Sequence, residues 1–420
     1  MSYFSSILNR HKPRRVSSSY RTSIQRLVRK LEKQLTDSQE PENHVAAYEE
    51  LLEKLGKAGI IRCAMEKLKT PQGTGAGPDG IALKNLENSE RWNLAESIAE
   101  CVIKDWIVAG DTREISIHSY SSNGLRKLRA IQIQNVAERS RDKAIVELLA
   151  PMLEPQLSPT MFGGHNGRGY LHALAYAKTY TDTNQAHHWV VQDVKSAFDS
   201  VDLRQLDTAL RKLIPCERLC SFLTNVYTHR ADRGIITGSP LSPLLLNVYL
   251  YHVIDKRFAA CHPSVPLIRY VDDLMLPCKS EEQAESCCKT LTSLFDSARL
   301  KFKQGGCESV DLREHPCPWL GFEANVDQGI TSYAPTKRVL TDIESGCIGA
   351  PIHLKKTEWE GVLNSLGAAY SEELLSWLTK QNRNRNELQP SRYQLSARQL
   401  KKIFRKSAKR FIKLLETVKL

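Results

Sequence analysis

The sequence predicts an α+β fold, in which short apolar strands that end on acids alternate with amphipathic helices. HWVVQDV (188–194) is an apolar run that ends on an acid, and LIRYVDDLMLP (267–277) is a pair of short apolar runs broken by two adjacent acids. Much of the remaining chain places apolar residues three and four positions apart, which is the spacing of an amphipathic helix. With 420 residues, the chain is long enough for two or three subdomains around sizeable cores.

Helices and one β-hairpin are expected in the N-terminal part of the chain. The stretch TPQGTGAGPDG (70–80) is dense in Gly and Pro and predicts a loop. Residues 113–133 alternate between polar and apolar and predict a hairpin with its turn at Ser121–Gly124. Helical spacing covers residues 20–35, 43–69, 89–109 and 136–153.

The later part of the chain combines helices with three loop or turn signals. FGGHNGRG (162–169) predicts a glycine-rich loop, GSPLSP (238–243) a rigid turn, and CPWLGFEA (317–324) a short hairpin. After that hairpin, the chain is expected to be helical to its end. Further helices are expected over residues 170–180, 203–230, 244–258 and 281–299.

The last helix has the clearest start signal. Ser396 is placed to cap its N-terminus, with Gln399 three residues later as the partner in a capping box. Lys and Arg cover the face opposite a single apolar stripe. The stripe consists of Leu400, Ile403, Phe404, Ala408, Phe411, Leu415 and Val418.

Positive charge is concentrated at the two ends of the chain. Residues 1–35 carry a net charge of +8 and residues 391–420 a net charge of +9. Because the whole chain carries +12, the middle is left with −5. Basic ends on a mildly acidic body suit a polyanionic partner, bound through phosphate neutralisation and counterion release. A pair of basic helices facing solvent is the alternative explanation.

The cysteines and the apolar runs indicate a cytoplasmic protein without a membrane partner. The 11 cysteines form no CxxC pair, and adjacent Cys287 and Cys288 cannot jointly complete a normal zinc site. Reduced structural or surface thiols are therefore expected. No apolar run approaches the roughly 20 residues of a membrane helix, and the N-terminus lacks the apolar core of a secretory signal.

Two adjacent acids between apolar strands predict a metal-binding turn. The strands bring Asp272 and Asp273 to the tip of a buried hairpin, where two carboxylates repel unless a cation compensates. Asp193, at the end of its own apolar strand, supplies a third acid. Mg²⁺ prefers such oxygen ligands, and a two-metal site activates an attacking 3′-hydroxyl and steadies a leaving pyrophosphate. An Asp-Asp turn alone is a common surface feature, so the prediction depends on the motifs around it.

Six motifs, in order along residues 75–330, resemble those of reverse transcriptases. Tyr270-Val271-Asp272-Asp273 resembles the YxDD box, and DVKSAFDSVD (193–202) resembles the first catalytic motif. TGSPLSP (237–243) resembles the turn before the family's third conserved helix, and WLGF (319–322) the primer-grip hairpin. Two more motifs resemble fingers segments of group II intron and retron enzymes, namely RAIQIQNVAER (129–139) and FGGHNGRGYLHAL (162–174).

The resemblance implies a right-hand polymerase with fingers, a palm built of an antiparallel sheet plus helices, and a helical thumb. It implies four consecutive segments: a basic helical N-terminal extension over 1–60, fingers over 61–185, a palm with the acids and the primer grip over 186–330, and a basic helical thumb over 331–420.

The resemblance also implies the catalytic and metal-binding residues. Asp193 and Asp272 are implied to ligate two Mg²⁺ ions, which Mn²⁺ can replace, and Asp273 is implied to assist. Val194, next to the first acid, completes the implied metal site. Asp273 ranks behind the other two acids as a direct ligand.

Five residues are implied to contact the incoming deoxynucleoside triphosphate. Arg129 matches the fingers arginine, whose guanidinium suits bidentate binding of phosphate, and Lys127 is a candidate helper. An ordinary exposed charge on a strand is the alternative for both. Phe198, five residues after Asp193, is implied to exclude a 2′-hydroxyl; simple packing is the alternative. Gly238 and Ser239 are small enough to let the backbone approach the nascent base pair.

Contacts to primer, template and RNA are implied at three places. Arg168 in the glycine-rich loop is implied to touch the template, with a solvated arginine as the alternative. The hairpin and box residues implied at the primer and template are Tyr270, Val271, Trp319, Leu320 and Gly321. The basic residues of the last helix expected to bind RNA are Lys401, Lys402, Arg405, Lys406, Lys409 and Arg410.

The chain departs from the family pattern in two motifs. Thr237 stands where a Gln commonly precedes Gly238, which puts the usual template-side contact in doubt. The lysine that follows the YxDD hairpin, a suspected general acid for pyrophosphate, aligns with Gly306. Lys301 and Lys303 lie nearby in the sequence, and the sequence alone does not assign the role to either.

The size favours a compact stand-alone enzyme, because fingers, palm and thumb account for nearly the whole chain. Such enzymes resemble retron reverse transcriptases and the bacterial unknown group, many of which act in antiphage defence. We favour the defence-associated type, with a structured non-coding RNA as template and DNA as product. A retron-type enzyme, a catalytically weak RNA-binding scaffold and an RNA-dependent RNA polymerase remain as alternatives.

Overall fold

The computed structural model gathers the chain into two compact units, each built from three separated segments. Unit 1 comprises Met1–Ile117, Arg129–Pro159 and Ser196–Lys256, and unit 2 comprises His118–Leu128, Thr160–Lys195 and Arg257–Leu420. The predicted division into four consecutive segments stays a prediction. The structure describes residues 25–31, 33, 41–68, 75–106, 110–120, 126–164, 167–228, 233–303, 305–348, 356–388 and 394–420.

Unit 1 is mainly helical, and its helices are shorter than the sequence predicts. The helix expected over 43–69 divides at Gly56, where an added Cβ would lie 2.7 Å from Ile103 Cγ1. The helix expected to reach residue 109 ends at Ile103. Residues 25–31 are helical, and the rest of the helix expected over 20–35 is described only at residue 33. The helices are α2 (Pro41–Leu55), α3 (Ala58–Lys67), α5 (Asn88–Ile103), α6 (Val136–Leu153), α8 (Leu203–Leu213), α9 (Glu217–Thr228) and α10 (Ser242–Leu250).

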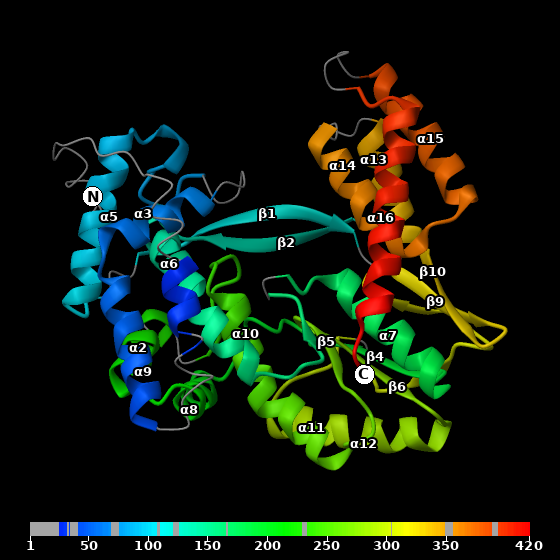
Figure 1. Cartoon of the computed structure of the whole chain (residues 1–420), viewed down its shortest axis with the longest axis horizontal. Helices are drawn as coiled ribbons and strands as arrows, with labels where there is room; N and C mark the ends of the chain where they lie inside the picture. The colour runs from blue at the N-terminus through cyan, green and yellow to red at the C-terminus, as the bar shows by residue number, and fades with distance from the viewer. Residues whose placement is uncertain are drawn as a thin grey trace. The chain divides into compact units, whose positions relative to one another are not determined.

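The predicted β-hairpin is confirmed as a two-stranded sheet of β1 (Arg113–Tyr120) and β2 (Arg126–Ile133) (Figure 1). Its predicted turn at 121–124 lies outside the described residues. After β2 the chain enters α6, whose start has a capping box of Asn135 and Glu138. Because the capping box starts α6 at once, only Gln134 and Asn135 connect the strand to the helix.

Unit 2 contains a five-stranded sheet in the order β3-β5-β6-β4-β7. The strand β3 runs parallel to β5, and the pairs β5–β6, β6–β4 and β4–β7 are antiparallel. The sequence missed β3 and β7, because two or three residues are too few for a period-2 pattern. The strands are β3 (Met161–Phe162), β4 (His188–Asp193), β5 (Ile268–Tyr270), β6 (Asp273–Cys278) and β7 (Ser309–Asp311).

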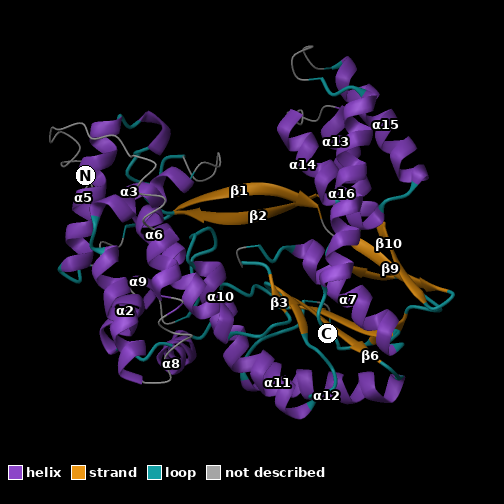
Figure 2. Ribbon diagram, in the orientation of Figure 1, coloured by secondary structure: helices purple, strands orange, loops and turns teal. Residues whose placement is uncertain are grey.

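Helices α7 (Tyr170–Asn184) and α12 (Glu281–Ser297) cover opposite faces of this sheet (Figure 2). Successive residues of a strand point to opposite faces, so Trp189 and Asp193 share a face. Trp189 is fully buried on the α7 side, where its indole Nε1 donates to Thr181 Oγ1 at 2.9 Å. The first acid of the predicted site therefore lies on the face that α7 covers further along the strand.

A second sheet of three strands, in the order β10-β9-β8, follows in unit 2. Its strands are β8 (Cys317–Trp319), β9 (Phe322–Asp327) and β10 (Ile330–Pro335). The predicted hairpin over 317–324 is present and continues into β10, so the expectation of a wholly helical C-terminal part was wrong. Both turns use two residues with positive φ, Leu320-Gly321 and Gln328-Gly329, which is the geometry that joins adjacent antiparallel strands tightly.

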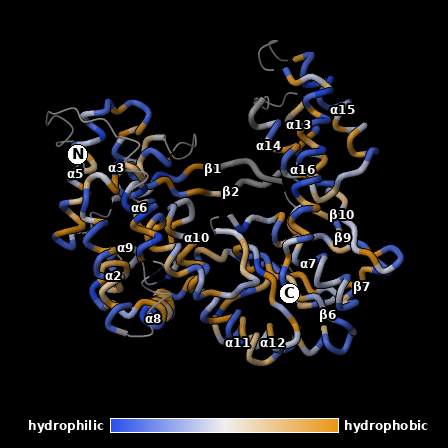
Figure 3. Tube along the Cα trace, viewed as in Figure 1, coloured by the Kyte–Doolittle hydropathy of each residue, from blue (hydrophilic) through white to orange (hydrophobic). Residues whose placement is uncertain are grey.

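Four helices complete unit 2, and the last confirms its sequence pattern. The Ser396 side chain accepts from the Gln399 backbone N–H, and the Gln399 side chain accepts from the Ser396 N–H. Hydrophilic and hydrophobic residues mix along this helix (Figure 3), and Leu400, Phe404 and Phe411 are buried. No helix in the described residues is both long and apolar enough to cross a membrane. The helices are α13 (Lys337–Ile348), α14 (Lys356–Ser365), α15 (Glu372–Glu387) and α16 (Ala397–Thr417).

Candidate active site

The two adjacent acids lie at a two-residue turn between β5 and β6. Tyr270 pairs with Asp273 across the hairpin, which leaves Val271 and Asp272 as the turn. Val271 has a φ of 57°, a left-handed conformation that is costly for a β-branched residue. The turn therefore needs support from the structure around it.

That support comes from a buried arginine and from β3. Arg269 is fully buried, and its Nη1 donates to the Val271 carbonyl oxygen at 2.7 Å. The Val271 backbone N–H donates to the Phe162 carbonyl oxygen at 3.1 Å. Both polar groups of the strained residue are thus held from inside the unit. The sequence reasoning missed Arg269, although a charged residue within an otherwise apolar strand was the signal.

The glycine-rich loop packs directly against this turn. The pairing of β3 with β5 brings Gly163 beside it, with a φ of +75°. A Cβ at Gly163 would lie 2.8 Å from Val271 Cγ2 and 2.9 Å from Tyr270 Cε2. Both distances are too short for a real contact, so only glycine lets the loop and the acid turn lie this close.

Antiparallel pairing of β4 with β6 places Asp193 directly opposite Asp273. Side chains that face each other in this way have Cβ atoms about 4.5–5.5 Å apart on one face of the sheet, and like charges there destabilise the pair. The Val194 backbone N–H donates to the Asp272 carbonyl oxygen at 3.2 Å, which fixes the turn to the end of β4. The predicted meeting of acids from two strand ends is present for Asp193 and Asp273.

A lysine compensates part of this negative charge. The Lys303 ammonium forms an ion pair with the Asp193 carboxylate, and the Lys303 backbone N–H donates to the Asp193 carbonyl oxygen at 2.9 Å. The Lys195 N–H donates in turn to the Lys301 carbonyl oxygen at 2.8 Å. Of the two lysines that the sequence left unassigned, Lys303 is the one whose side chain reaches an acid of the site.

The residues present suit a magnesium ion held by few protein ligands. In the part of the chain that the structure describes, no three His, Cys, Asp or Glu side chains lie close enough together to hold a metal ion. Mg²⁺ needs no such cage, because it is usually bound by one or two carboxylates with waters and substrate phosphates. The facing pair Asp193 and Asp273 provides that donor set. The ranking of Asp272 above Asp273, and the ligand role of Val194, stay predictions.

In unit 1, the turn TGSPLSP packs against the end of β2. The Gln132 N–H donates to the Thr237 carbonyl oxygen at 2.9 Å. Gly238 has a φ of +116°, and a Cβ there would lie 2.7 Å from the Gln132 carbonyl oxygen. Glycine is therefore required at this position for backbone packing. The implied role of Gly238 beside a base pair stays a prediction.

A buried polar network anchors the neighbouring serine. The Ser239 hydroxyl donates to Asp142 Oδ2 at 2.7 Å, and Gln134 Nε2 donates to the same oxygen at 3.0 Å. Arg141 donates from Nε and Nη2 to Asp142 Oδ1, at 3.0 and 2.8 Å. A buried carboxylate with this many partners holds its surroundings rigidly. The sequence reasoning missed Asp142, whose only signal was an Arg-Asp pair inside a helix rich in apolar residues.

The candidate sugar-contacting residue is tied to the same part of unit 1. Phe198 is half-buried, and its carbonyl oxygen accepts from the Ile235 N–H at 2.9 Å. The Gly234 N–H donates to the Val201 carbonyl oxygen at 2.8 Å, so the segment leading to the TGSPLSP turn braces the Phe198 loop. The implied triphosphate ligands Arg129 and Lys127 lie on β2, and their side chains fall outside the described residues.

Three of the implied primer or template contacts are packed inside unit 2. The Arg168 guanidinium lies over the Phe162 ring, 4.7 Å from its centroid. Trp319 is buried and meets Trp189 edge-on, with ring centroids 6.2 Å apart. Tyr270 is half-buried, and burial followed by the nearby charge of Asp273 raises its pKa. Direct contacts of these side chains with nucleic acid stay predictions.

The basic residues expected to bind RNA lie on the exposed face of α16. All six are exposed. Arg405 is also engaged within unit 2, since its Nε donates to the Tyr370 hydroxyl at 3.1 Å and its Nη2 pairs with Glu372 at 3.3 Å. The other five exposed basic residues of this set are Lys401, Lys402, Lys406, Lys409 and Arg410.

Comparisons with known proteins agree with the motif resemblance. Residues 120–324 match the family described as reverse transcriptase (RNA-dependent DNA polymerase). The group II intron-encoded protein LtrA of Lactococcus lactis subsp. cremoris is 28% identical over 141 residues, covering 31% of this chain and 23% of that protein. The retrovirus-related Pol polyprotein from type-1 retrotransposable element R2 of Nasonia vitripennis is 27% identical over 143 residues, covering 29% of this chain and 14% of the polyprotein. The chain thus spans less than a quarter of either relative, and its resemblance to reverse transcriptases is confirmed.

We expect Mg²⁺ to stabilise the fold through the facing acids. At ten times its dissociation constant, Mg²⁺ should raise the free energy of unfolding of the wild type by about 1.4 kcal/mol. Asp273→Asn removes one of the two facing charges, so this variant should gain less than half as much at the same concentration. Without metal, it should be at least as stable as the wild type, because the repulsion is relieved.

Urea unfolding with and without Mg²⁺ measures both quantities. Asp327→Asn, at an exposed position on β9, is the matched control and should keep the full metal effect. An equal gain in stability for the wild type and Asp273→Asn would show that the facing acids are not a metal site.

Proposed function

We propose that the reverse transcriptase domain of this chain is an active RNA-directed DNA polymerase that uses two Mg²⁺ ions. The observation that carries the proposal is the strand register that sets Asp193 opposite Asp273, beside the turn at Asp272. Carboxylates that face each other lower the stability of a fold unless a cation compensates their charge. Their retention at a turn braced by Arg269 and Gly163 supports a catalytic role over a scaffold that has lost turnover.

The proposed reaction is attack of a primer 3′-hydroxyl on the α-phosphorus of a deoxynucleoside triphosphate, with release of pyrophosphate. When bound, the ions lower the pKa of the hydroxyl and neutralise the leaving group. Asp193, Asp272 and Asp273 would hold the ions through their carboxylates, with the Val194 carbonyl oxygen as a further ligand. Lys303, which reaches Asp193 in this structure, is our candidate for protonating pyrophosphate.

The other site residues have proposed roles in choosing and placing the nucleotide. We assign the triphosphate to Arg129, helped by Lys127, and the face of the sugar to Phe198. Gly238 and Ser239 support the base pair. The bracing of Ser239 by Asp142 favours this role, because a rigid backbone keeps the position of a base pair fixed.

The proposed biological setting is copying of a structured non-coding RNA into DNA in the bacterial cytoplasm, in antiphage defence. The exposed basic residues of α16 support this setting, because they suit a polyanionic RNA. A retron-type enzyme is the second candidate. Sequencing the RNA and DNA that copurify with the protein tests whether copying takes place: one abundant structured RNA with its complementary DNA supports copying, and RNA without DNA supports a binding scaffold.

Removing both turn acids should abolish synthesis. We expect Asp272→Ala with Asp273→Ala to lower deoxynucleotide incorporation with Mg²⁺ by at least ~10³-fold, because several kcal/mol of transition-state charge stabilisation are lost. The assay uses copurified RNA and a defined RNA template with a DNA primer. Glu281→Ala with Glu282→Ala removes two adjacent exposed acids from α12 and should leave incorporation unchanged. Equal incorporation by wild type and the Asp272/Asp273 variant would overturn the assignment.

Phe198 should set the preference for deoxynucleotides. We expect Phe198→Ala to reduce the ratio of deoxynucleotide to ribonucleotide incorporation by roughly 10- to 10²-fold, the scale expected when a steric barrier of ~1–3 kcal/mol is removed. Phe198→Tyr keeps the ring and should keep the ratio. Competition assays measure it from kcat/KM for each nucleotide. An unchanged ratio in Phe198→Ala would mean that the ring only packs, and an RNA-dependent RNA polymerase would return as an alternative.

The exposed lysines of α16 should contribute to RNA binding by neutralising phosphates. Replacing Lys401, Lys402, Lys406 and Lys409 by Gln should weaken RNA binding and lower the slope of log K against log salt by ~0.7 for each phosphate that is no longer neutralised. Arg405 is left in place because it bonds Tyr370. The control replaces four exposed lysines elsewhere, Lys84, Lys212, Lys256 and Lys279. An identical salt slope in the α16 variant and the control would indicate that the α16 face is merely solvated.

A further inference from the structure

Four cysteines that look scattered in the sequence come together in unit 2 as two thiol pairs. Cys287 and Cys288 are adjacent on α12, and neighbours on a helix point about 100° apart. Each therefore meets a different partner: Cys287 is hydrogen-bonded with Cys278 of β6, and Cys288 with Cys307. The structure holds all four as free thiols, and no sequence pattern indicates the pairing.

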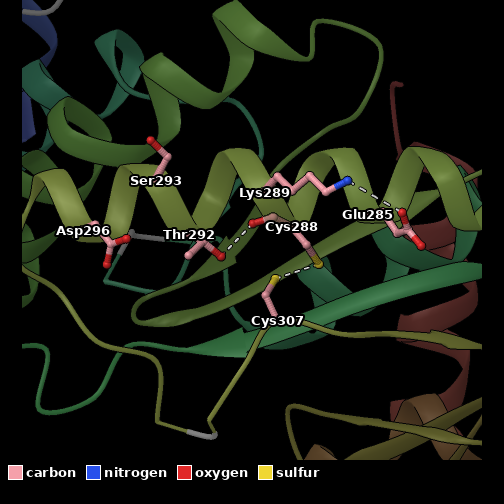
Figure 4. Close-up of a pocket in the computed structure, with 7 residues that line it drawn as sticks. All are labelled: Glu285, Cys288, Lys289, Thr292, Ser293, Asp296 and Cys307. Atoms are coloured by element: carbon pink, nitrogen blue, oxygen red, sulfur yellow. Dashed lines mark hydrogen bonds and ion pairs between the residues drawn. The ribbon is translucent and has the colours of Figure 1, made fainter.

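The two pairs differ in their access to solvent. Cys288 and Cys307 line a pocket of about 540 Å³, with Glu285 and Lys289 also in its wall (Figure 4). Cys278 is completely buried, as is Cys287, and neither lines this pocket. A small polar oxidant can therefore reach the Cys288–Cys307 pair directly, while the Cys278–Cys287 pair is shielded.

The geometry of the Cys288–Cys307 pair suits bond formation between the two sulfurs. The Cys307 Sγ donates a hydrogen bond to the Cys288 Sγ at 2.8 Å, and Figure 4 shows the two side chains pointing toward one another. A disulfide needs a separation of about 2.05 Å, so closure requires a movement of less than 1 Å. The pair is thus already placed for a disulfide while it is still reduced.

The hydrogen bond also couples the protonation of the two sulfurs. It holds the pKa of the Cys288 thiol below its usual value, against burial and the nearby Glu308 and Glu285 carboxylates. The same hydrogen bond, together with burial, raises the pKa of Cys307. Because the thiolate is the reactive form, the sulfur that loses its proton first attacks and the other resolves.

We propose that Cys288 and Cys307 form a peroxide-reactive dithiol that closes to a disulfide beside the acid site. The thiolate of one of the two cysteines attacks one peroxide oxygen, the O–O bond breaks, and the departing hydroxide takes a proton to leave as water. That cysteine is then a sulfenic acid. The sulfur of the other cysteine, on losing its proton, attacks the sulfenic sulfur; the S–S bond forms, the S–O bond breaks, and hydroxide leaves with that proton as a second water. Two thiols lose two electrons and one peroxide gains them.

The disulfide would act on the segment that reaches Asp193. Cys307 follows Gly306, whose carbonyl oxygen accepts a hydrogen bond from Gln192 Nε2 at 2.9 Å. Lys303, which lies four residues before Cys307 in the sequence, forms the ion pair with Asp193. Linking Cys307 to α12 restrains this segment and keeps the Lys303 ammonium on the carboxylate that must bind metal. Oxidation should therefore lower polymerase activity; this second step rests on the proposed function, while disulfide formation does not.

The test treats the folded full-length protein with hydrogen peroxide and reads the product by mass spectrometry. We expect a loss of about 2 Da, the two hydrogens of the thiols, reversed by dithiothreitol. Tryptic peptides 280–289 and 304–313 should be linked, and fragmentation should place the bond on Cys288. Cys288→Ser and Cys307→Ser should each abolish the link. Cys287→Ser, the adjacent buried control, and Cys261→Ser, the exposed control, should both retain it.

Each outcome decides one claim. A link that persists in Cys288→Ser, or a Cys278–Cys287 link that forms first, would overturn the dithiol proposal. The absence of any link in peroxide-treated wild-type protein would also overturn it. If the link forms and incorporation by oxidised and reduced wild type is equal, the dithiol stands and its control of the acid site is wrong. If reduced protein shows no incorporation at all, the proposed polymerase function fails, and the mass result still decides the dithiol.

Discussion

The pairing of β4 with β6 forces two carboxylates to face each other, and much of unit 2 can be understood as support for that pairing. A one-residue shift in register would move Asp193 to the opposite face of the sheet. The register is protected by burial, because Trp189 on the same strand must point into the core beneath α7. The repulsion between the facing acids is offset in this structure by Lys303. Under the proposed function, a metal ion would take the place of the Lys303 ammonium.

The acid turn itself depends on close packing as much as on charge. Val271 adopts a left-handed backbone conformation, and Arg269 satisfies its carbonyl group from inside the core. Gly163 lets the glycine-rich loop pack against the turn where a larger residue would collide with it. In unit 1, Asp142 plays a comparable part, since it fixes Ser239 and Gln134 together. In both units, the residues that are implied to contact substrate are held in position by residues that have no such implied contact.

The sequence predicted the α+β class, the order of the main elements and the facing of acids from two strand ends, because periodicity and motif order are local signals. It did not predict β3, β7 or β10, whose short strands acquire their definition from pairing, and it ran helices through Gly56 and past Ile103. It also missed Arg269, Asp142 and the Cys288–Cys307 pair. Those residues acquire their roles from neighbours that tertiary packing brings together, which one sequence does not reveal.

The central claim is that Asp193 and the turn acids bind the metal ions used for DNA synthesis. The most direct measurement is anomalous X-ray diffraction from crystals of the protein with an RNA template, a DNA primer, a non-hydrolysable deoxynucleotide and Mn²⁺. The account predicts anomalous peaks between the Asp193 carboxylate and those of Asp272 and Asp273, with the Lys303 ammonium moved away from Asp193. The claim would be contradicted by a bound nucleotide without metal at these carboxylates, with Lys303 still paired to Asp193.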